Sequence, residues 1–137
     1  KDSSDNWETF ESLLHVGRRH DIAVLQGSER LVARSVLAGA DGAVPGIANL
    51  VPGLAAGLIA ASRVGDEPGA MALQHRFDAV CALQTSGFWL ASLKAAASRL
   101  GLCGPTLASG MPGLDAADEK RLNEFIPVVE REARRHE

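Results

Sequence analysis

The chain has 137 residues, of which 14 are basic and 17 acidic, and it contains no tyrosine. This length suits one domain with a buried core, but it excludes a complete (β/α)8 barrel, which needs roughly 250 residues. With a net charge of −3, the chain offers no basic surface to hold a phosphate backbone, so we expect no nucleic-acid partner.

The composition also argues against a membrane span, a disulfide framework and a metal site. The most apolar stretch, residues 47–62, is interrupted by Asn49 and Pro52 and is shorter than the roughly 20 residues that cross a bilayer. Cys81 and Cys103 are too few for a disulfide framework, and the four histidines show no metal-ligand spacing. We therefore expect a cytoplasmic protein with reduced thiols, no metal and no membrane partner.

The first part of the chain predicts a helix followed by a strand. Asp5 or Asn6 can cap the helix, which ends at the basic residues 18–20, where positive charge suits a helix C-terminus. The apolar run over residues 22–26 is too short for a helix and predicts a strand that is buried on both faces.

Two further units repeat this plan up to residue 65. Ser28 is expected to cap a helix that ends at Gly39. A strand over 42–44 and a helix from about residue 50 to residue 64 follow. The alternation predicts an α/β fold with a parallel sheet and crossover helices, and such compact repeats with very short strands are typical of a barrel.

No strand is expected after residue 65. Helices are predicted over 71–83 and 88–100, and Asp115 can cap a last helix that Pro127 should kink or break. The predicted organisation is therefore three βα units in residues 1–65 and an α-helical region in residues 66–137 that packs on them.

In parallel βα architecture, functional groups lie where strands end and helices begin. In this chain those places are residues 1–4, 27–30 and 44–49. They carry a lysine, glycines and several polar side chains, which makes them the candidates for a site.

Several short motifs, some at these places and others at predicted helix junctions and in a late helix, occur together with the spacing of a known family. They are Lys1-Asp2-Ser3-Ser4, Gln26-Gly27-Ser28-Glu29, Leu37 to Val44 (LAGADGAV), Ile47-Ala48-Asn49 followed by Pro52, Gly65-Asp66, and Leu93-Lys94 with Leu100-Gly101. In combination they resemble the dihydrodipicolinate synthase and N-acetylneuraminate lyase family along the whole chain.

The resemblance implies a pyruvate-dependent class I aldolase or lyase on a (β/α)8 TIM barrel, of which this chain would be the last three βα units plus a C-terminal helical appendage. Lys1 matches the lysine that forms a Schiff base with pyruvate, so the implied intermediate is a covalent imine and no separate cofactor is expected. A lysine attacks a carbonyl only as the neutral amine, and partial burial at a barrel mouth favours that form.

The resemblance also implies substrate-binding positions. Gly27 and Val44 match positions whose backbone carbonyls line the pyruvate end of the pocket, and Ser28 follows in the same turn. Glu29 and Gly46 lie where relatives choose their second substrate. Arg30 could hold a carboxylate there, although a solvated charge at a helix start is the simpler interpretation.

These positions favour a 2-keto-3-deoxy sugar acid or a related 2-keto acid as the substrate. A sialic acid lyase is disfavoured, because it would have an Asp-Glu pair at residues 29–30 and a serine at Gly46. The alternatives are 4-hydroxy-tetrahydrodipicolinate synthase, whose proline-rich run before the late helix is replaced by residues 90–94, and a non-catalytic barrel of the same ancestry.

Three further expectations follow from the resemblance. We expect roughly five βα units before Lys1, and with them the tyrosine that relatives use to relay protons, because this chain has none. We expect a homo-oligomer, either a tetramer or a dimer. Phe88 and Trp89 are interpreted as packing residues at the barrel edge or at a subunit contact.

Overall fold

The computed structural model describes residues 1–83 and 89–135 of the chain. Phe88, for which we predicted a packing role, lies outside these residues. The elements in chain order are α1 (Trp7–His20), β1 (Leu25–Gln26), the 3-10 turn η1 (Glu29–Leu31), α2 (Val32–Leu37), β2 (Gly42–Ala43), the 3-10 turn η2 (Gly46–Asn49), α3 (Pro52–Arg63), α4 (Glu67–Cys81), α5 (Trp89–Arg99) and α6 (Ala116–Arg134).

The two strands pair in parallel, with Leu25 opposite Gly42, and Asp2 adds a parallel bridge to Gln26 on the other edge of β1. The predicted parallel sheet is thus present, but its strands are shorter than expected. Ile22 is 60% exposed, and its N–H donates to a carbonyl in the last turn of α1, so the run over 22–26 joins the sheet only toward its end.

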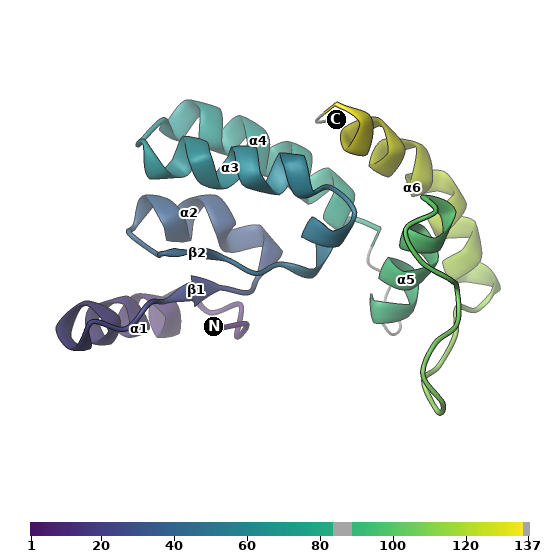
Figure 1. Cartoon of the computed structure of the whole chain (residues 1–137), viewed down its shortest axis with the longest axis horizontal. Coiled ribbons are helices and arrows are strands. Elements are labelled where there is room, and N and C mark those ends of the chain that lie inside the picture. Colours follow the sequence, from purple (N-terminus) through teal and green to yellow (C-terminus); the bar gives the residue numbers. More distant parts are fainter. Residues whose placement is uncertain (84–88, 136–137) are drawn as a thin grey trace.

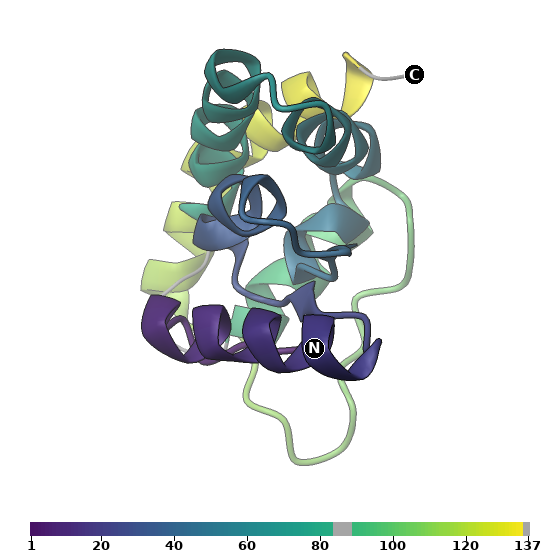
Figure 2. The ribbon, with the colours of Figure 1, turned by 90° about the vertical axis from the view of Figure 1, so that its left-hand side faces the viewer.

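Helices α1 and α2 pack on the sheet as neighbours (Figures 1 and 2), and Arg34 of α2 lies over the Trp7 ring of α1 at 3.8 Å. Helices α3 and α4 pack against α2. The carboxyl ends of β1 and β2 point toward the end of the molecule at which α5 and α6 lie. The architecture is α/β and mostly helical, and every strand in the described residues precedes residue 66, as predicted.

Several helix ends follow the predicted capping residues. Asn6 caps α1 by accepting a hydrogen bond from the Thr9 N–H at 2.9 Å, and Asp115 caps α6 in the same way. Gly39 ends the α2 unit in the left-handed region, with a φ of 97° that favours glycine. The prediction for Ser28 is wrong: its side chain makes no capping bond, and the helix begins as a 3-10 turn.

Pro127 does not break α6, which runs from Ala116 to Arg134. A proline inside a helix removes one hydrogen bond and crowds the preceding turn. Here, Leu122 before the proline and Val129 after it are both buried in the main core, so packing on both sides holds the helix in one piece. None of the helices in residues 1–83 and 89–135 is long and apolar enough to cross a bilayer.

One hydrophobic core joins the two regions of the chain. Leu54 and Leu58 of α3, Phe77 of α4 and Val129 of α6 are each completely buried within it. A smaller cluster, formed by α1, Val24 and the segment after α2, contains Phe10. The helices after residue 66 are therefore packed on the βα units rather than standing apart from them.

A buried ion cluster adds to this packing between α4 and α6. Glu132 is only 2% exposed, and its Oε2 accepts a hydrogen bond from Arg76 Nη2 at 2.6 Å. Burial opposes ionisation of Glu132, but the hydrogen bonds and charges of Arg76, Arg131 and Arg135 together hold the pKa of this carboxyl below its ordinary value.

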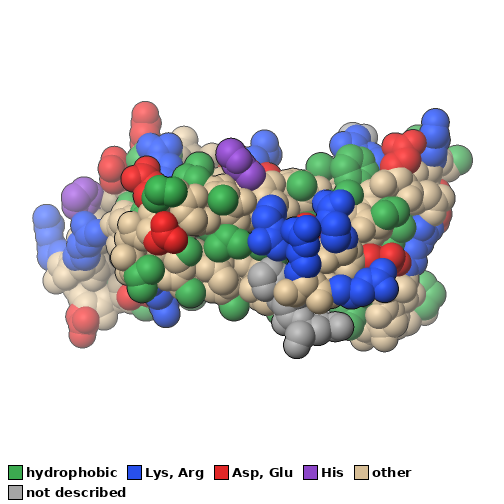
Figure 3. Space-filling view, turned by 90° about the horizontal axis from the view of Figure 1, so that it is seen from above, with side chains coloured by type: hydrophobic (Ala, Val, Ile, Leu, Met, Phe, Trp, Pro, Cys, Tyr) green, Lys and Arg blue, Asp and Glu red, His purple; other side chains and the backbone are tan. Residues whose placement is uncertain are grey.

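Basic side chains gather in the middle of the face seen in Figure 3.

Candidate functional site

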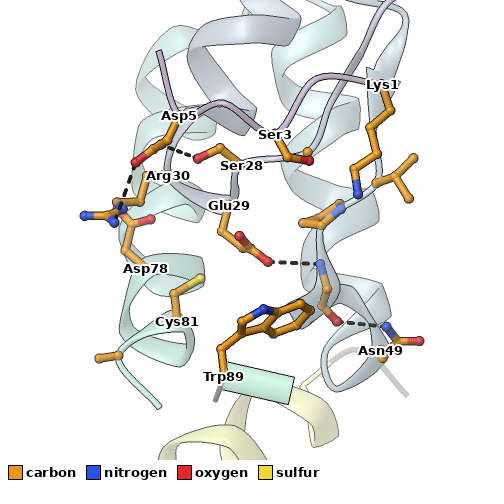
Figure 4. A pocket seen from close by; sticks show the side chains of 15 residues that line it. Lys1, Ser3, Asp5, Ser28, Glu29, Arg30, Asn49, Asp78, Cys81 and Trp89 are labelled. Carbon is orange, nitrogen blue, oxygen red and sulfur yellow. Dashed lines mark hydrogen bonds and ion pairs between the residues drawn. The ribbon is translucent and has the colours of Figure 1, made fainter. Parts of the chain in front are cut away.

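The ends of the three paired segments converge on one cleft of about 760 Å³. All six residues predicted from the sequence lie around it, namely Lys1, Gly27, Ser28, Glu29, Val44 and Gly46. Arg30 lines it as well. The side chains drawn in Figure 4 come from strand ends on one side and from helices on the other.

Lys1 is placed by backbone pairing next to β1. The Asp2 N–H donates to the Leu25 carbonyl at 3.0 Å, and the Gly27 N–H donates to the Asp2 carbonyl at 2.6 Å. This pairing carries Lys1 to the mouth of the cleft, where its side chain points inward (Figure 4). Lys1 is exposed, in contrast to the partial burial that we expected.

Gly27 is the residue that gives the Lys1 side chain its path. A Cβ atom at Gly27 would lie 2.4 Å from Lys1 Cε, 2.1 Å from Ser3 Oγ and 2.7 Å from the Asp2 carbonyl oxygen. These distances are far below van der Waals contact, so a larger residue here would have to push the lysine or its backbone away. Glycine at this position is a requirement of close approach.

The turn after β1 is held from below by Gln26. Its side chain is completely buried, and its Oε1 accepts hydrogen bonds from the N–H groups of Gly27 at 2.8 Å and Ser28 at 2.7 Å. Its Nε2 donates to Ser35 Oγ at 2.8 Å. Because every polar atom of this amide has a partner, the turn that presents residues 27–30 has a defined position.

Asp5 organises the outer rim of the cleft and was not singled out as a site residue from the sequence. Its backbone is in the left-handed region, with a φ of 56°, which is uncommon for a residue other than glycine. Ser28 Oγ donates to Asp5 Oδ1 at 2.5 Å, and Arg30 lies 3.6 Å from Asp5 Oδ2. Asp5 therefore binds the hydroxyl that was expected to cap α2, and it is paired with the arginine that was considered for a carboxylate.

Glu29, Gly46 and Trp89 meet at the base of the cleft. The Gly46 N–H donates to Glu29 Oε1 at 3.0 Å, and a Cβ atom at Gly46 would lie 3.0 Å from the Trp89 ring. Gly46 thus leaves room for the indole, which is 45% exposed. Trp89, which was predicted to be a packing residue, forms part of the wall of the cleft.

Helix α4 contributes two side chains that carried no signal in the sequence, Asp78 and Cys81. Burial raises the pKa of the Cys81 thiol to about 12, and the carboxylates of Glu29 and Asp78 add to this shift. The thiol is therefore protonated and uncharged at neutral pH. Only the tertiary packing of α4 against η1 could have revealed these residues.

The part of the chain that the structure describes contains no group of three or more His, Cys, Asp or Glu side chains that could hold a metal ion. The chemistry available in the cleft is that of a primary amine, three carboxylates, a guanidinium and a neutral thiol.

Lys1 precedes the parallel bridge at Asp2 and lies beside the carboxyl ends of two parallel strands, an arrangement that fits the carboxyl face of an α/β barrel. The chain matches the dihydrodipicolinate synthetase family over residues 1–127 and belongs to this family. The family expected from the sequence motifs is thereby confirmed.

Relatives with known sequences or structures agree with this assignment. Two proteins described as uncharacterized DapA-like lyases, from two strains of Halobacterium salinarum, are 34% identical over 102 residues, which cover 74% of this chain and 34% of theirs. The structure resembles a dihydrodipicolinate synthase from Bacteroides thetaiotaomicron at 29% identity, with a TM-score of 0.82 over 95% of this chain and 45% of that one.

A 2-keto-3-deoxygluconate aldolase variant from Sulfolobus solfataricus shares the fold at 20% identity, with a TM-score of 0.79 over 98% of this chain and 45% of that one. The chain thus spans about a third of the length of these curated relatives and less than half of these solved structures.

Proposed function

We propose that the protein is a pyruvate-dependent class I aldolase or lyase in which Lys1 is the nucleophile. The observation that carries this proposal is the position of Lys1 beside the carboxyl end of β1, with its side chain directed into the cleft through the space that Gly27 leaves. Lys1 is one of three lysines in the chain, and the other two, Lys94 and Lys120, do not line the cleft.

In the proposed reaction, the Nζ lone pair attacks the carbonyl carbon of pyruvate, and water leaves as the C=N bond of the imine forms. Loss of a methyl proton to water gives an enamine, because the iminium draws the electron pair of the C–H bond. The enamine carbon then forms a C–C bond with the carbonyl carbon of an aldehyde, whose oxygen gains a proton. Hydrolysis of the imine releases the product and restores the amine, and the cleavage reaction follows these steps in reverse. No separate cofactor is required.

The proposed roles of the other predicted residues follow from their places around the lysine. We propose that the backbone carbonyls at Gly27 and Val44, which both line the cleft, form its pyruvate end. Ser28 would support the turn after β1 through its hydrogen bond to Asp5. Glu29 is held by the Gly46 N–H farther from Lys1, where the second substrate would extend.

We propose a 2-keto-3-deoxy sugar acid, or a related 2-keto acid, as the substrate. The second candidate is 4-hydroxy-tetrahydrodipicolinate synthase, which the 29% identity to the Bacteroides thetaiotaomicron dihydrodipicolinate synthase favours. The two candidates share the pyruvate imine and differ in the aldehyde, which is an uncharged polyol in the first and carries an amino acid group in the second.

Borohydride trapping tests the shared step. The full-length protein is incubated with pyruvate and sodium borohydride, which reduces an imine to a stable secondary amine, and peptides are mapped by mass spectrometry. We expect the mass of one reduced pyruvate on Lys1. Lys1→Arg keeps the positive charge but removes the nucleophile, so it should abolish the adduct, whereas Lys120→Arg on the exposed face of α6 should retain it.

Absence of an adduct on wild-type protein that is folded by circular dichroism would refute the aldolase and leave the non-catalytic barrel. We also propose that the protein is a cytoplasmic homo-oligomer of two or four copies. Analytical ultracentrifugation of the full-length protein measures the number of copies, and a monomer at micromolar concentration would contradict that part of the proposal.

A further inference from the structure

The wall of the cleft that faces Lys1 is built by the C-terminal helices. In Figure 4, Lys1 lies at one side of the cleft and Asp78 and Cys81 lie at the other, with Glu29 and Trp89 between them. A substrate whose carbonyl reaches Lys1 would therefore extend its far end toward Trp89 and Asp78.

The carboxylates of Glu29 and Asp78 on this wall form no close ion pair within the described residues, although Arg30 also lines the cleft. Arg30 is paired with Asp5 at 3.6 Å. Within residues 1–83 and 89–135, neither Glu29 nor Asp78 has an ion-pair partner. The wall thus presents two carboxylates without ion-pair partners against one arginine that is already paired with Asp5, and this excess of negative charge disfavours an anionic group there.

The same carboxylates are good acceptors for hydroxyl groups. Asp78 Oδ1 accepts a hydrogen bond from the neutral amide of Gln74 at 2.7 Å, and Glu29 Oε1 accepts one from Gly46. The second oxygen of each carboxylate has no hydrogen-bond donor in the described part of the chain. An ionised carboxylate only accepts hydrogen bonds, so the second oxygen of each of these half-buried groups can accept one from a substrate hydroxyl in place of water.

Trp89 adds an apolar plane beside these acceptors. Its ring and Glu29 Oε1 both lie within 3.5 Å of the point that a Cβ atom at Gly46 would occupy, so the indole and the carboxylate border the same space. The neutral Cys81 thiol adds no charge to the wall. An exposed aromatic face next to carboxylate acceptors suits a polyol chain, whose C–H groups pack on the ring while its hydroxyls donate to the oxygens.

We propose that Asp78 and Trp89 determine the specificity for the second substrate, by binding the hydroxyl-bearing chain of an uncharged polyhydroxy aldehyde and disfavouring an aldehyde with a carboxylate at its far end. This inference rests on the proposed aldolase function and names the substrate class of the same site. It assigns a binding role to helices α4 and α5, which carry none of the strand-end motifs.

The test compares two aldehydes in the full-length protein with pyruvate present. The value of kcat/KM is measured for glyceraldehyde and for succinic semialdehyde. The readout is the kcat/KM for glyceraldehyde divided by that for succinic semialdehyde. Asp78→Asn keeps an oxygen that can accept from Gln74 but removes the charge. We expect kcat/KM to fall roughly tenfold for glyceraldehyde and to rise for succinic semialdehyde, because a charge-assisted hydrogen bond and a repulsion are lost together.

Trp89→Leu removes the aromatic face, and Trp89→Phe keeps it. We expect the leucine variant to lose roughly tenfold in kcat/KM for glyceraldehyde and the phenylalanine variant to recover most of this loss. Glu124→Gln, which removes an exposed carboxylate from α6, is the matched control and should leave the ratio unchanged. If Trp89→Leu does not fold, Trp89→Phe and Asp78→Asn still decide the question.

Borohydride trapping with pyruvate on the same wild-type sample separates the two proposals. An adduct on Lys1 together with a ratio that stays within twofold in Asp78→Asn would overturn the assignment of specificity and leave the aldolase intact. No adduct on Lys1 would overturn both. A fall in the ratio, with the two aldehydes moving in opposite directions, supports the assignment and cannot arise from a general loss of stability.

Discussion

The two regions of the chain position their side chains by different physical means. In residues 1–65, Gly27 and Gly46 are important because they have no side chain. Lys1 lies against Gly27 and the ring of Trp89 lies against Gly46, each so close that an added Cβ atom would crowd it. In residues 66–135, helices are held by charge and by burial, as at the Arg76–Glu132 pair. One region should therefore be sensitive to an added methyl group, and the other to a removed charge or a buried titratable group.

The largest expected effect concerns Cys81 in the second region. With its pKa raised to about 12, the thiolate fraction at pH 8 is about 10⁻⁴, on the order of 10³-fold below that of an ordinary cysteine. Iodoacetamide should therefore label the exposed Cys103 far faster than Cys81, as measured by peptide mass spectrometry. Labelling of Cys81 should increase steadily from pH 8 to pH 10.5.

The folded state retains the Cys81 proton, so the stability that this thiol contributes is present below pH 9 and is lost as the pH rises toward 12. Labelling of unfolded protein in urea should be equal at both cysteines and serves as the control. Equal rates in the folded protein would contradict the buried, protonated thiol.

The next effect tests the charge that holds α6. Glu132→Gln leaves Arg76 without its buried carboxylate, and loss of one partner of a buried ion pair costs about 3 kcal/mol. Urea denaturation followed by circular dichroism should show this loss in the free energy of unfolding. Glu124→Gln, on the exposed side of the same helix, should change it by less than about 0.5 kcal/mol.

The same variant carries a pH signature. Because the pKa of Glu132 is lowered in the folded state, its contribution to stability is present above the ordinary value of 4.5 and is lost as the pH falls through the lowered one. Wild-type protein should lose stability in acid more steeply than Glu132→Gln. Parallel acid profiles for the two proteins would show that the neighbouring arginines do not lower the pKa of Glu132 in the folded state.

An added methyl group tests the first region. In Gly27→Ala, the new Cβ would meet Lys1 Cε at 2.4 Å and the Asp2 carbonyl oxygen at 2.7 Å, so the lysine must leave its position. We expect the rate of borohydride trapping with pyruvate to fall about 100-fold, which corresponds to about 2.7 kcal/mol. A trapping rate within threefold of wild type would show that the position of Lys1 does not depend on Gly27.

The smallest effect is expected at Gly57, inside α3, where an added Cβ has no neighbour within 4 Å. Gly57→Ala should stabilise the helix by roughly 0.5–1 kcal/mol and leave trapping unchanged, which makes it the matched control for Gly27→Ala. Thermal unfolding measures the change. A loss of activity in Gly57→Ala would mean that methyl groups disturb the first region wherever they are added.

Much of the fold could be predicted because local rules determine it. Asn6 and Asp115 cap their helices with their own side chains, and Gly39 adopts the left-handed conformation that ends a helix. Such features depend on a few neighbouring residues. Ser28 shows where this fails, because its hydroxyl binds Asp5, 23 positions away in the sequence, instead of the nearby backbone.

The candidate site divides in the same way. The strand-end rule and the family motifs found the residues from Lys1 to Gly46, because parallel strands bring their ends to one edge. Asp78, Cys81 and Trp89 could not be identified as cleft residues from the sequence. They lie on helices whose apolar spacing indicates only which residues pack in the core. Their place in the cleft depends on how α4 and α5 meet the strand ends.

Gln74 links these two parts through a single amide. Its Nε2 donates to the Glu29 carbonyl at 2.9 Å, and its Oε1 accepts from the Ala33 N–H at 2.9 Å. It thus supplies the start of α2 with the partner that no capping side chain provides. For protein engineering, this makes the C-terminal helices unsuitable as an interchangeable module. A chimera joined between α3 and α4 would keep the turn of Glu29 only if the incoming helix also brought a glutamine, or an equivalent amide, at the position of Gln74.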